Sequence, residues 1–256
     1  MTWNLDATTH TARIRLGALT LALTLASPAF ASEESAKARL KAMSDFMAAQ
    51  PTISLTFDSD IEVITPQMEK IQFTNSGELT LSRPNKLRAH RAGGYVDVEL
   101  VFDGKMVSIH SKTLNAYFQA EAPGTIDQLV AALRAGHGVA LPGGDYILAQ
   151  PYDVLVADVL EAKHIGTGII DGVRCDHLAF RNFDTDWQIW IEAGGRPFPR
   201  KVVITSKTIG GAPQYTLRIK TWRSGEPVPA DIFAFTPPAG AAKLASDELI
   251  KLDELP

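Results

Sequence analysis

Cysteine, clustered basic side chains and long hydrophobic segments are all scarce in this sequence of 256 residues. Cys175 is the only cysteine, which excludes an intramolecular disulfide and leaves stability to the hydrophobic core. The formal net charge at pH 7 is -4 and no run of Lys or Arg occurs, so the sequence lacks the electrostatic surface that binds nucleic acids. An apolar run near the N-terminus, Leu16 to Ala26, is too short to span a bilayer as a helix.

The N-terminal segment has the composition of a secretory signal peptide. Arg13 and Arg15 precede the apolar run, and the small residues before position 32 resemble a cleavage site. We therefore expect export to the periplasm, removal of residues 1–31 by cleavage after Ala31, and a mature chain, residues 32–256, that folds as one domain. An ordinary buried N-terminal helix is the alternative interpretation.

Three segments have apolar residues at helical spacing. The first covers residues 32–50. Thr125 and Gln128 have the spacing of a capping box at the start of the second, residues 125–136. Residues 151–160 are apolar over most of a helical circumference, so this third helix needs cover on several sides. We expect the second and third helices to act as lids or to fill the inside of a curved sheet.

Most of the remaining chain alternates apolar and polar residues, which is typical of strands with one buried face. Asp171-Gly172 and Asp103-Gly104-Lys105 are hairpin signals between such strands. The order of strands, helices and further strands predicts an α+β fold. We expect a single strongly curved antiparallel β-sheet, a half-open barrel, with helices covering its concave face.

The sequence contains no recognisable catalytic or metal-binding pattern. Cys175 and His177 share a strand face, but neighbouring aspartates raise the pKa of a thiol and make it less reactive. A metal site formed across strands by His164 and His177 is a weaker alternative, and Asp184-x-Asp186 lies in a turn without further calcium ligands. We therefore expect no enzyme activity, no cofactor and no bound metal.

Three motifs follow one another along the chain. Residues 77–88 read G-E-L-T-L-S-R-P-N-K-L-R, a strand that Pro84 must bend or end. The Asp103-Gly104-Lys105 hairpin follows, and residues 232–240 read I-F-A-F-T-P-P-A-G. In this order the motifs resemble those of the periplasmic lipoprotein-carrier family, the LolA/LolB-like proteins. Residues 176–201 resemble an uncharacterised group of predicted periplasmic proteins in the same superfamily.

The resemblance implies a role for Arg83. In the carrier family the arginine of the R-P-N motif holds helices over an apolar cavity by hydrogen bonds to the lid backbone. The rigid five-donor fork of arginine suits such a latch. A surface arginine after a strand is the alternative. The chain departs from the family at Lys86-Leu87, where an aromatic residue is usual, and its middle section is longer.

The resemblance also implies a binding or carrier protein for a lipid, a lipoprotein or another amphipathic ligand. The alternative is a structural or interaction module of the cell envelope whose cavity is filled by its own helices. Partners would be the ligand or an envelope protein, with transient membrane contact and a monomeric state. The expected apolar cavity is formed by six strand residues: Phe57, Leu79, Leu81, Val98, Leu100 and Phe102.

Overall fold

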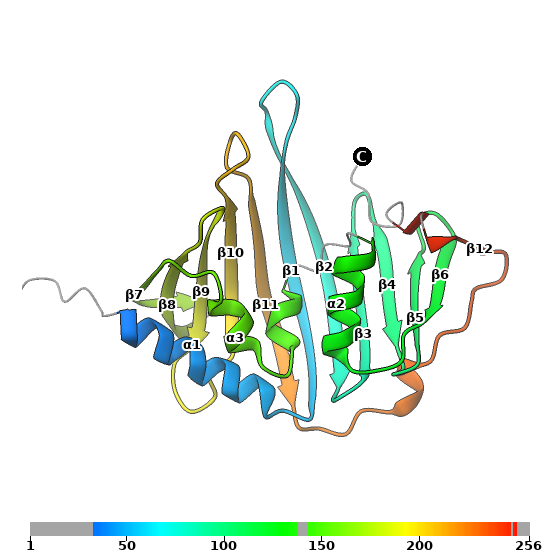
Figure 1. Ribbon diagram of the computed structural model, residues 1–256, viewed down its shortest axis with the longest axis horizontal. Coiled ribbons are helices and arrows are strands. Elements are labelled where there is room, and N and C mark those ends of the chain that lie inside the picture. The colour runs from blue at the N-terminus through cyan, green and yellow to red at the C-terminus, as the bar shows by residue number, and fades with distance from the viewer. Residues whose placement is uncertain (1–32, 138–142, 247, 250–256) are drawn as a thin grey trace, which may run out of the picture.

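The computed structural model describes residues 33–137, 143–246 and 248–249, which form one twelve-stranded sheet with helices against one face (Figure 1). The expected signal peptide and its cleavage site lie outside the described residues. The order of the strands across the sheet is β12-β6-β5-β4-β3-β2-β1-β11-β10-β9-β8-β7. In chain order the strands are β1 (Thr52–Ile64), β2 (Lys70–Ser82), β3 (Lys86–Gly93), β4 (Asp97–Phe102), β5 (Met106–Ser111), β6 (Ala116–Glu121), β7 (Glu161–Ile170), β8 (Val173–Arg181), β9 (Thr185–Glu192), β10 (Pro199–Ser206), β11 (Gln214–Ser224) and β12 (Ala242–Lys243).

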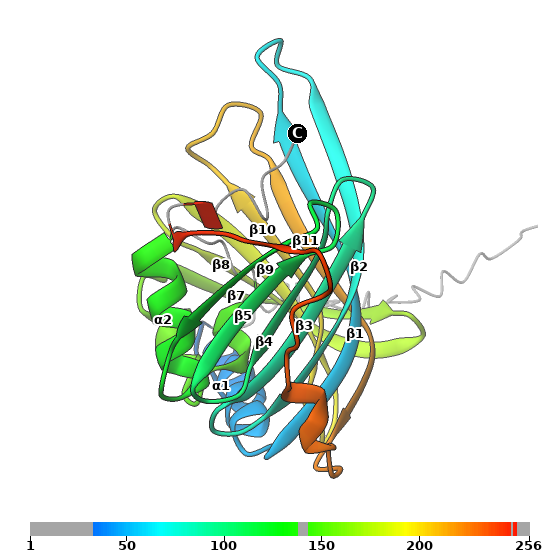
Figure 2. The ribbon, with the colours of Figure 1, turned by 90° about the vertical axis from the view of Figure 1, so that its right-hand side faces the viewer.

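The sheet curls without closing, because its two outermost strands, β7 and β12, do not pair with each other (Figure 2). Neighbouring strands are antiparallel except at one edge, where the short β12 runs parallel to β6. The prediction of a large, mostly antiparallel β-sheet in a half-open form is confirmed. The parallel edge strand was not expected from the sequence.

The alternating sequence pattern produces aligned rows of side chains across the sheet. One row runs across five strands and consists of the paired residues Ile53, Leu81, Leu87, Phe102 and Val107, all buried. Because side chains alternate between faces, this row defines one face, which we call the inner face. Burying such a row removes its apolar surface from water and stabilises the curved sheet.

Two hairpins follow the predicted turn chemistry. Asp171 and Gly172, between β7 and β8, both have positive φ angles, 48° and 80°. This conformation matches the strong twist of a two-residue hairpin and favours an Asp-Gly pair. In the β4–β5 turn the Asp103 carboxylate accepts hydrogen bonds from the backbone N–H groups of Lys105 and Met106, 2.8 Å each. Both hairpin predictions are confirmed.

The first two predicted helices are also confirmed. Helix α1 (Glu33–Ala48) buries one apolar stripe that includes Leu40, Met43 and Met47. Helix α2 (Ile126–His137) begins with a reciprocal capping box. The Thr125 N–H donates to Gln128 Oε1 at 2.9 Å, and the Gln128 N–H donates to Thr125 Oγ1 at 3.3 Å. Both helices lie against the inner face (Figure 1).

The prediction for residues 151–160 is wrong in two respects. Helix α3 (Pro151–Val156) ends after six residues, and the apolar side chains of the segment are only partly enclosed, since Val154 in α3 is 46% and Leu160 after it 67% exposed. The segment packs beside α1 and the 3-10 helix η1 (Gly144–Ile147), with Leu155, Val156 and Val159 against the core. Its apolar composition therefore reflects partial contact on one side, and α3 does not fill the interior.

The C-terminal segment crosses the outer face of the sheet (Figure 2). Phe233, in the 3-10 helix η2 (Ala230–Phe233), is buried there. The Phe235 ring lies 5.8 Å from the ring of Tyr117. Arg88 joins this segment to the sheet, because its guanidinium donates to the Ile232 carbonyl at 2.8 Å. The two aromatic residues of the F-x-F motif thus cover strands from outside.

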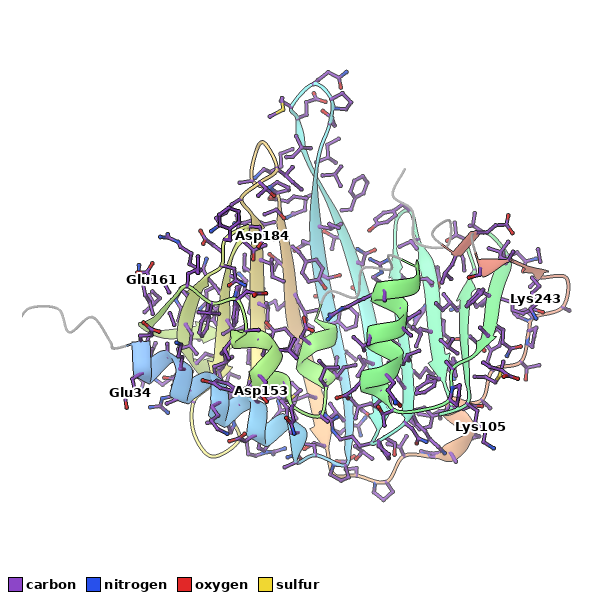
Figure 3. The ribbon with its side chains drawn as sticks, in the orientation of Figure 1. Glu34, Lys105, Asp153, Glu161, Asp184 and Lys243 are labelled. Atoms are coloured by element: carbon purple, nitrogen blue, oxygen red, sulfur yellow. The ribbon has the colours of Figure 1, made fainter. Side chains whose placement is uncertain are left out.

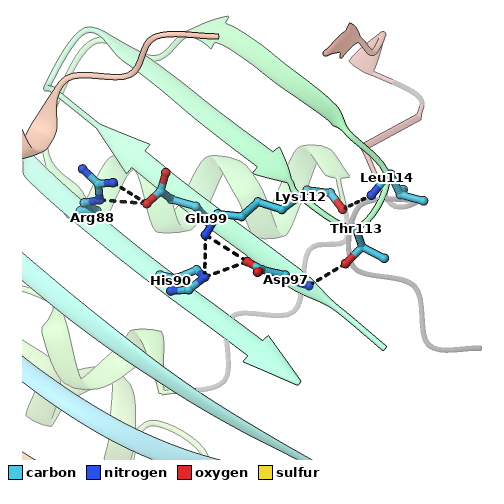
Figure 4. A network of polar contacts seen from close by, with 8 residues as sticks. Arg88, His90, Asp97, Glu99, Lys112, Thr113 and Leu114 are labelled. Carbon is cyan, nitrogen blue, oxygen red and sulfur yellow. Dashed lines mark hydrogen bonds and ion pairs between the residues drawn. The ribbon is translucent and has the colours of Figure 1, made fainter. Parts of the chain in front are cut away.

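Charged side chains form a network on the same outer face (Figure 4). Arg88 donates to Glu99 at 2.6 and 2.9 Å, and His90 Nε2 lies 2.8 Å from Asp97 Oδ1. Lys112 lies 3.3 Å from the same Asp97 oxygen. Charged side chains of neighbouring strands therefore form ion pairs on the outer face, while the inner face of these strands is largely apolar. Within the described residues, no helix combines the length and apolar character needed to cross a membrane.

Truncation of Leu81 should destabilise the fold. Leu81 is fully buried in the inner-face row, so the Leu81→Ala variant should lower the free energy of unfolding by about 2–5 kcal/mol. Met68→Ala is the matched control, because Met68 is 62% exposed and should change stability by less than about 0.5 kcal/mol. Urea denaturation followed by circular dichroism measures both. Equal effects of the two substitutions would contradict the assignment of the core.

Candidate functional site

A cavity of about 220 Å³ lies between the inner face and the elements that cover it. Its floor is formed by β1 to β5, β10 and β11, and its cover by α2, η1 and the end of α1. The α2 residues that face it recur at helical spacing: Leu129, Val130 and Leu133. A water molecule requires only about 10–15 Å³ on a comparable scale, so this space is large enough for a chain of several carbon atoms.

The lining of the cavity is strongly apolar, whereas many charged side chains are at the periphery of the molecule. Figure 3 labels several of these peripheral charges, among them Glu34, Lys105 and Asp184. The described lining residues include no Asp or Glu. An apolar cavity without carboxylates favours alkyl surface over polar solutes, because a buried polar group without partners loses its hydration.

The six residues expected to form the cavity divide into two groups. Phe57, Leu79, Val98 and Leu100 line it. Leu81 and Phe102 are fully buried in the packed row of the inner face below it. Sequence alternation identifies the correct face for all six, but it contains no information about where along each strand the covering helices leave space.

Arg83 lies where β2 ends, and its guanidinium donates three hydrogen bonds to backbone carbonyls. The acceptors are Gln50 O at 3.2 Å, Ile147 O at 2.9 Å and Met47 O at 3.4 Å. Met47 and Gln50 belong to the C-terminal end of α1 and the residues after it, where helix carbonyls lack partners within the helix. Ile147 belongs to η1. Arg83 therefore binds the backbone of two covering elements.

The Arg83–Pro84 corner also holds the start of α2. The Ile126 N–H donates to the Pro84 carbonyl at 2.9 Å, and the Arg83 N–H donates to Pro51 O at 2.8 Å. Burial lowers the pKa of the Arg83 guanidinium, and the nearby Asp127 carboxylate acts in the opposite direction. Arginine remains charged under these conditions, so this attachment does not depend on pH in the neutral range.

Several residues with polar side chains in the cavity lining, Tyr146 among them, were not identified from the sequence. Arg91 on β3 and Tyr215 on β11 both line the cavity. Burial raises the pKa of the Tyr215 phenol to about 12, although a hydrogen bond with Ser59 and the charge of Arg91 act in the opposite direction. The alternation of side chains along β3 could have predicted the position of Arg91, because Arg91 shares a strand face with Leu87 and Ala89.

The residues considered for catalysis or metal binding do not form a site. Cys175 is buried, its thiol contacts the Val173 carbonyl, and burial raises its pKa. His177 stacks on Trp190 and bonds to Gln188. A thiol with a raised pKa and a histidine engaged elsewhere do not act as a nucleophile and base.

His164 is engaged with partners other than His177. Its Nδ1 lies 3.1 Å from Ser35 Oγ, and its Nε2 lies 3.7 Å from Asp176 Oδ1. Arg39 approaches the other Asp176 oxygen at 3.5 Å, so these side chains connect α1 to β7 and β8. No group of three or more His, Cys, Asp or Glu side chains suitable for a metal ion occurs in the described part of the chain.

Comparisons with solved structures give several distant similarities. Lipoprotein LppX from Mycobacterium tuberculosis has 16% identical residues and a TM-score of 0.47, over 78% of this chain and 100% of that one. LprF from Mycobacterium bovis has 12% identity and a TM-score of 0.42, over 82% and 98%. A chain of the MucA/MucB complex from Pseudomonas aeruginosa has 11% identity and a TM-score of 0.43, over 78% and 61%. No curated protein matches the chain.

A family model described as "Predicted periplasmic protein (DUF2092)" matches residues 36–245. The match covers most of the described residues, from α1 to the strand at the sheet edge. It confirms the resemblance to an uncharacterised group of predicted periplasmic proteins and agrees with the expected periplasmic location. The chain belongs to the DUF2092 family of predicted periplasmic proteins.

Proposed function

We propose that this protein binds the alkyl part of an amphipathic molecule, a lipid or the acyl chain of a lipoprotein, and carries it in the periplasm. The observation that supports this function most directly is the apolar cavity of about 220 Å³ beneath α2 and η1. Transfer of each CH₂ group from water into such a cavity contributes about 0.8 kcal/mol. A chain of several CH₂ groups is bound by this effect alone, without catalytic groups.

In this proposal Arg83 acts as the latch of the cavity. Its hydrogen bonds fix η1 and the end of α1, which are parts of the cover, while the adjacent Pro84 carbonyl fixes the start of α2. Release of ligand requires these elements to move away from the sheet. Breaking the Arg83 hydrogen bonds would shift the population toward an open state.

A second candidate function is an interaction module of the cell envelope. It is favoured by exposed apolar side chains at the ends of two long hairpins, namely Met68 and Ile71 in the β1–β2 hairpin and Ile209 in the β10–β11 hairpin. Exposed apolar groups on a projecting element are typical of contact with a partner or a membrane surface. The two candidates differ in what the cavity does: only the carrier requires it to accept a ligand.

Filling the cavity should abolish ligand binding. Ala89 lines the cavity, whereas Ala92, on the same strand, points to the outer face. We expect Ala89→Trp to lose the binding of a fluorescent fatty acid that the native protein and the Ala92→Trp control retain. Fluorescence titration measures binding, and circular dichroism establishes that the variants are folded. A folded Ala89→Trp variant with unchanged affinity would contradict the assignment of the binding site.

Removal of the Arg83 latch should accelerate ligand release. In Arg83→Leu the three carbonyls lose a charged donor, and each hydrogen bond of this kind contributes about 1.5–3 kcal/mol. If the free energy of the open state, relative to the closed state, falls by the contribution of one such hydrogen bond, fatty acid should dissociate about ten- to a hundred-fold faster. Stopped-flow dissociation measures the rate.

Arg83→Lys is the companion variant, because it keeps the charge but not the planar fork, and its release rate should be intermediate. Hydrogen exchange in residues 144–148 should increase in Arg83→Leu. If release and exchange are both unchanged in the folded variant, Arg83 is not a latch.

A further inference from the structure

One level of polar residues interrupts the apolar inner face along the central strands. On β1 the inward residues are Ile53, Leu55 and Phe57, then Ser59, after which the apolar Ile61 and Val63 follow. On β2 the residue paired with Ser59 is Asn75. Ser59 and Asn75 are both about 2% exposed, so these polar groups are within the fold and not on its surface. An amphipathic ligand with its alkyl chain on the apolar rows would place its headgroup near this level.

Arg91 lies in the row next to this polar level. It is paired with Gly77 and Val98 in the row that also contains Phe57. Gly77 has no side chain, and the Phe57 ring occupies the space that a Cβ atom there would need. Among the described residues that line the cavity, Arg91 is the one with a permanently charged side chain.

Two phenol groups contact the residues of this level. Tyr215 lines the cavity and forms a hydrogen bond with Ser59, and because burial raises its pKa to about 12 it keeps its proton at neutral pH. The Tyr95 hydroxyl accepts a hydrogen bond from Asn75 Nδ2 at 3.2 Å. Arg91 and Tyr215 therefore line the same cavity, from strands β3 and β11.

This arrangement matches the chemistry of an anion. A guanidinium and phenol O–H groups are all donors, and hydrogen bonds from charged donors to carboxylate or phosphate oxygens are the strong ones in proteins. An uncharged headgroup, such as an alcohol, would gain much less from Arg91.

The geometry points to an anionic headgroup site at the end of the cavity, in which Arg91 and Tyr215 bind the carboxylate or phosphate of a single-chain lipid whose alkyl chain lies on the apolar rows. This inference rests on the proposed function, since the alkyl chain must first occupy the cavity. It adds that the ligand is an acidic lipid and not a neutral one.

The test compares ligands that share one alkyl chain and differ in the headgroup. Palmitic acid, hexadecyl phosphate and hexadecanol are titrated into the native protein at about pH 8, where carboxyl groups are ionised. We expect at least one of the two anions to bind about ten-fold or more tightly than the alcohol. The tighter of the two anions identifies the headgroup.

Variants separate the headgroup site from the cavity. Arg91→Gln should reduce the affinity for the anion to that for the alcohol and leave the affinity for the alcohol unchanged. Tyr215→Phe keeps the aromatic ring and should reduce the preference to a smaller extent. Arg88→Gln is the matched control, because Arg88 lies on the same strand but bonds to Glu99 on the outer face, and it should retain the full preference.

The possible failures are distinguishable. If hexadecanol binds the native protein as tightly as both anions, the headgroup site is wrong and the carrier function stands. If none of the three ligands binds, both the carrier function and the headgroup site are wrong. If Arg91→Gln fails to fold, Tyr215→Phe alone decides, and an undiminished preference for the anion in that variant contradicts the inference.

Discussion

The corner formed by Arg83 and Pro84 is a point at which α1, η1 and α2, the elements that cover the cavity, are all attached to the sheet. Its guanidinium binds the carbonyls at the end of α1 and in η1, and its Pro84 carbonyl binds the first turn of α2. These groups come from parts of the chain that are far apart in sequence. Because helix ends have backbone groups without partners inside the helix, one well-placed arginine can satisfy several of them at once.

The need for this attachment follows from the open sheet. Strands β7 and β12 do not meet, so the inner face is not enclosed by the sheet itself. Its apolar rows have to be covered by separate helices, and α1 and α2 provide one apolar stripe each. The cover packs closely over the row that contains Leu81 and leaves space over the row that contains Leu79. The cavity is therefore a consequence of where the helices are fixed.

Much of this fold was predictable from local patterns. Alternation identified the strands and their buried face, and turn residues identified the hairpins at Gly104 and Gly172. The Thr125–Gln128 capping box marked the start of α2. The interaction of Arg83 with covering backbone was predicted through the resemblance to the carrier family, although the acceptors in α1 were not anticipated. Its role in ligand retention stays a prediction.

Other features depend on tertiary placement that a single sequence does not contain. The apolar segment at 151–160 resembled a fully covered helix, but α3 is only six residues long and the segment is covered on one side only. The F-x-F motif could have packed on either face, and its course over the outer face is decided by Arg88 and η2. The presence of Arg91 and Tyr215 in one lining depends on the curvature that brings β3 and β11 to the same cavity.

The carrier function can be tested by native mass spectrometry of the mature protein purified from its own periplasm, because this measurement detects a bound ligand without prior choice of a probe. We expect a mass increase that corresponds to a lipid or an acylated polypeptide, and this increase should be absent from the Ala89→Trp variant. If the native protein has an unchanged mass and also acquires no added lipid, it is not a carrier.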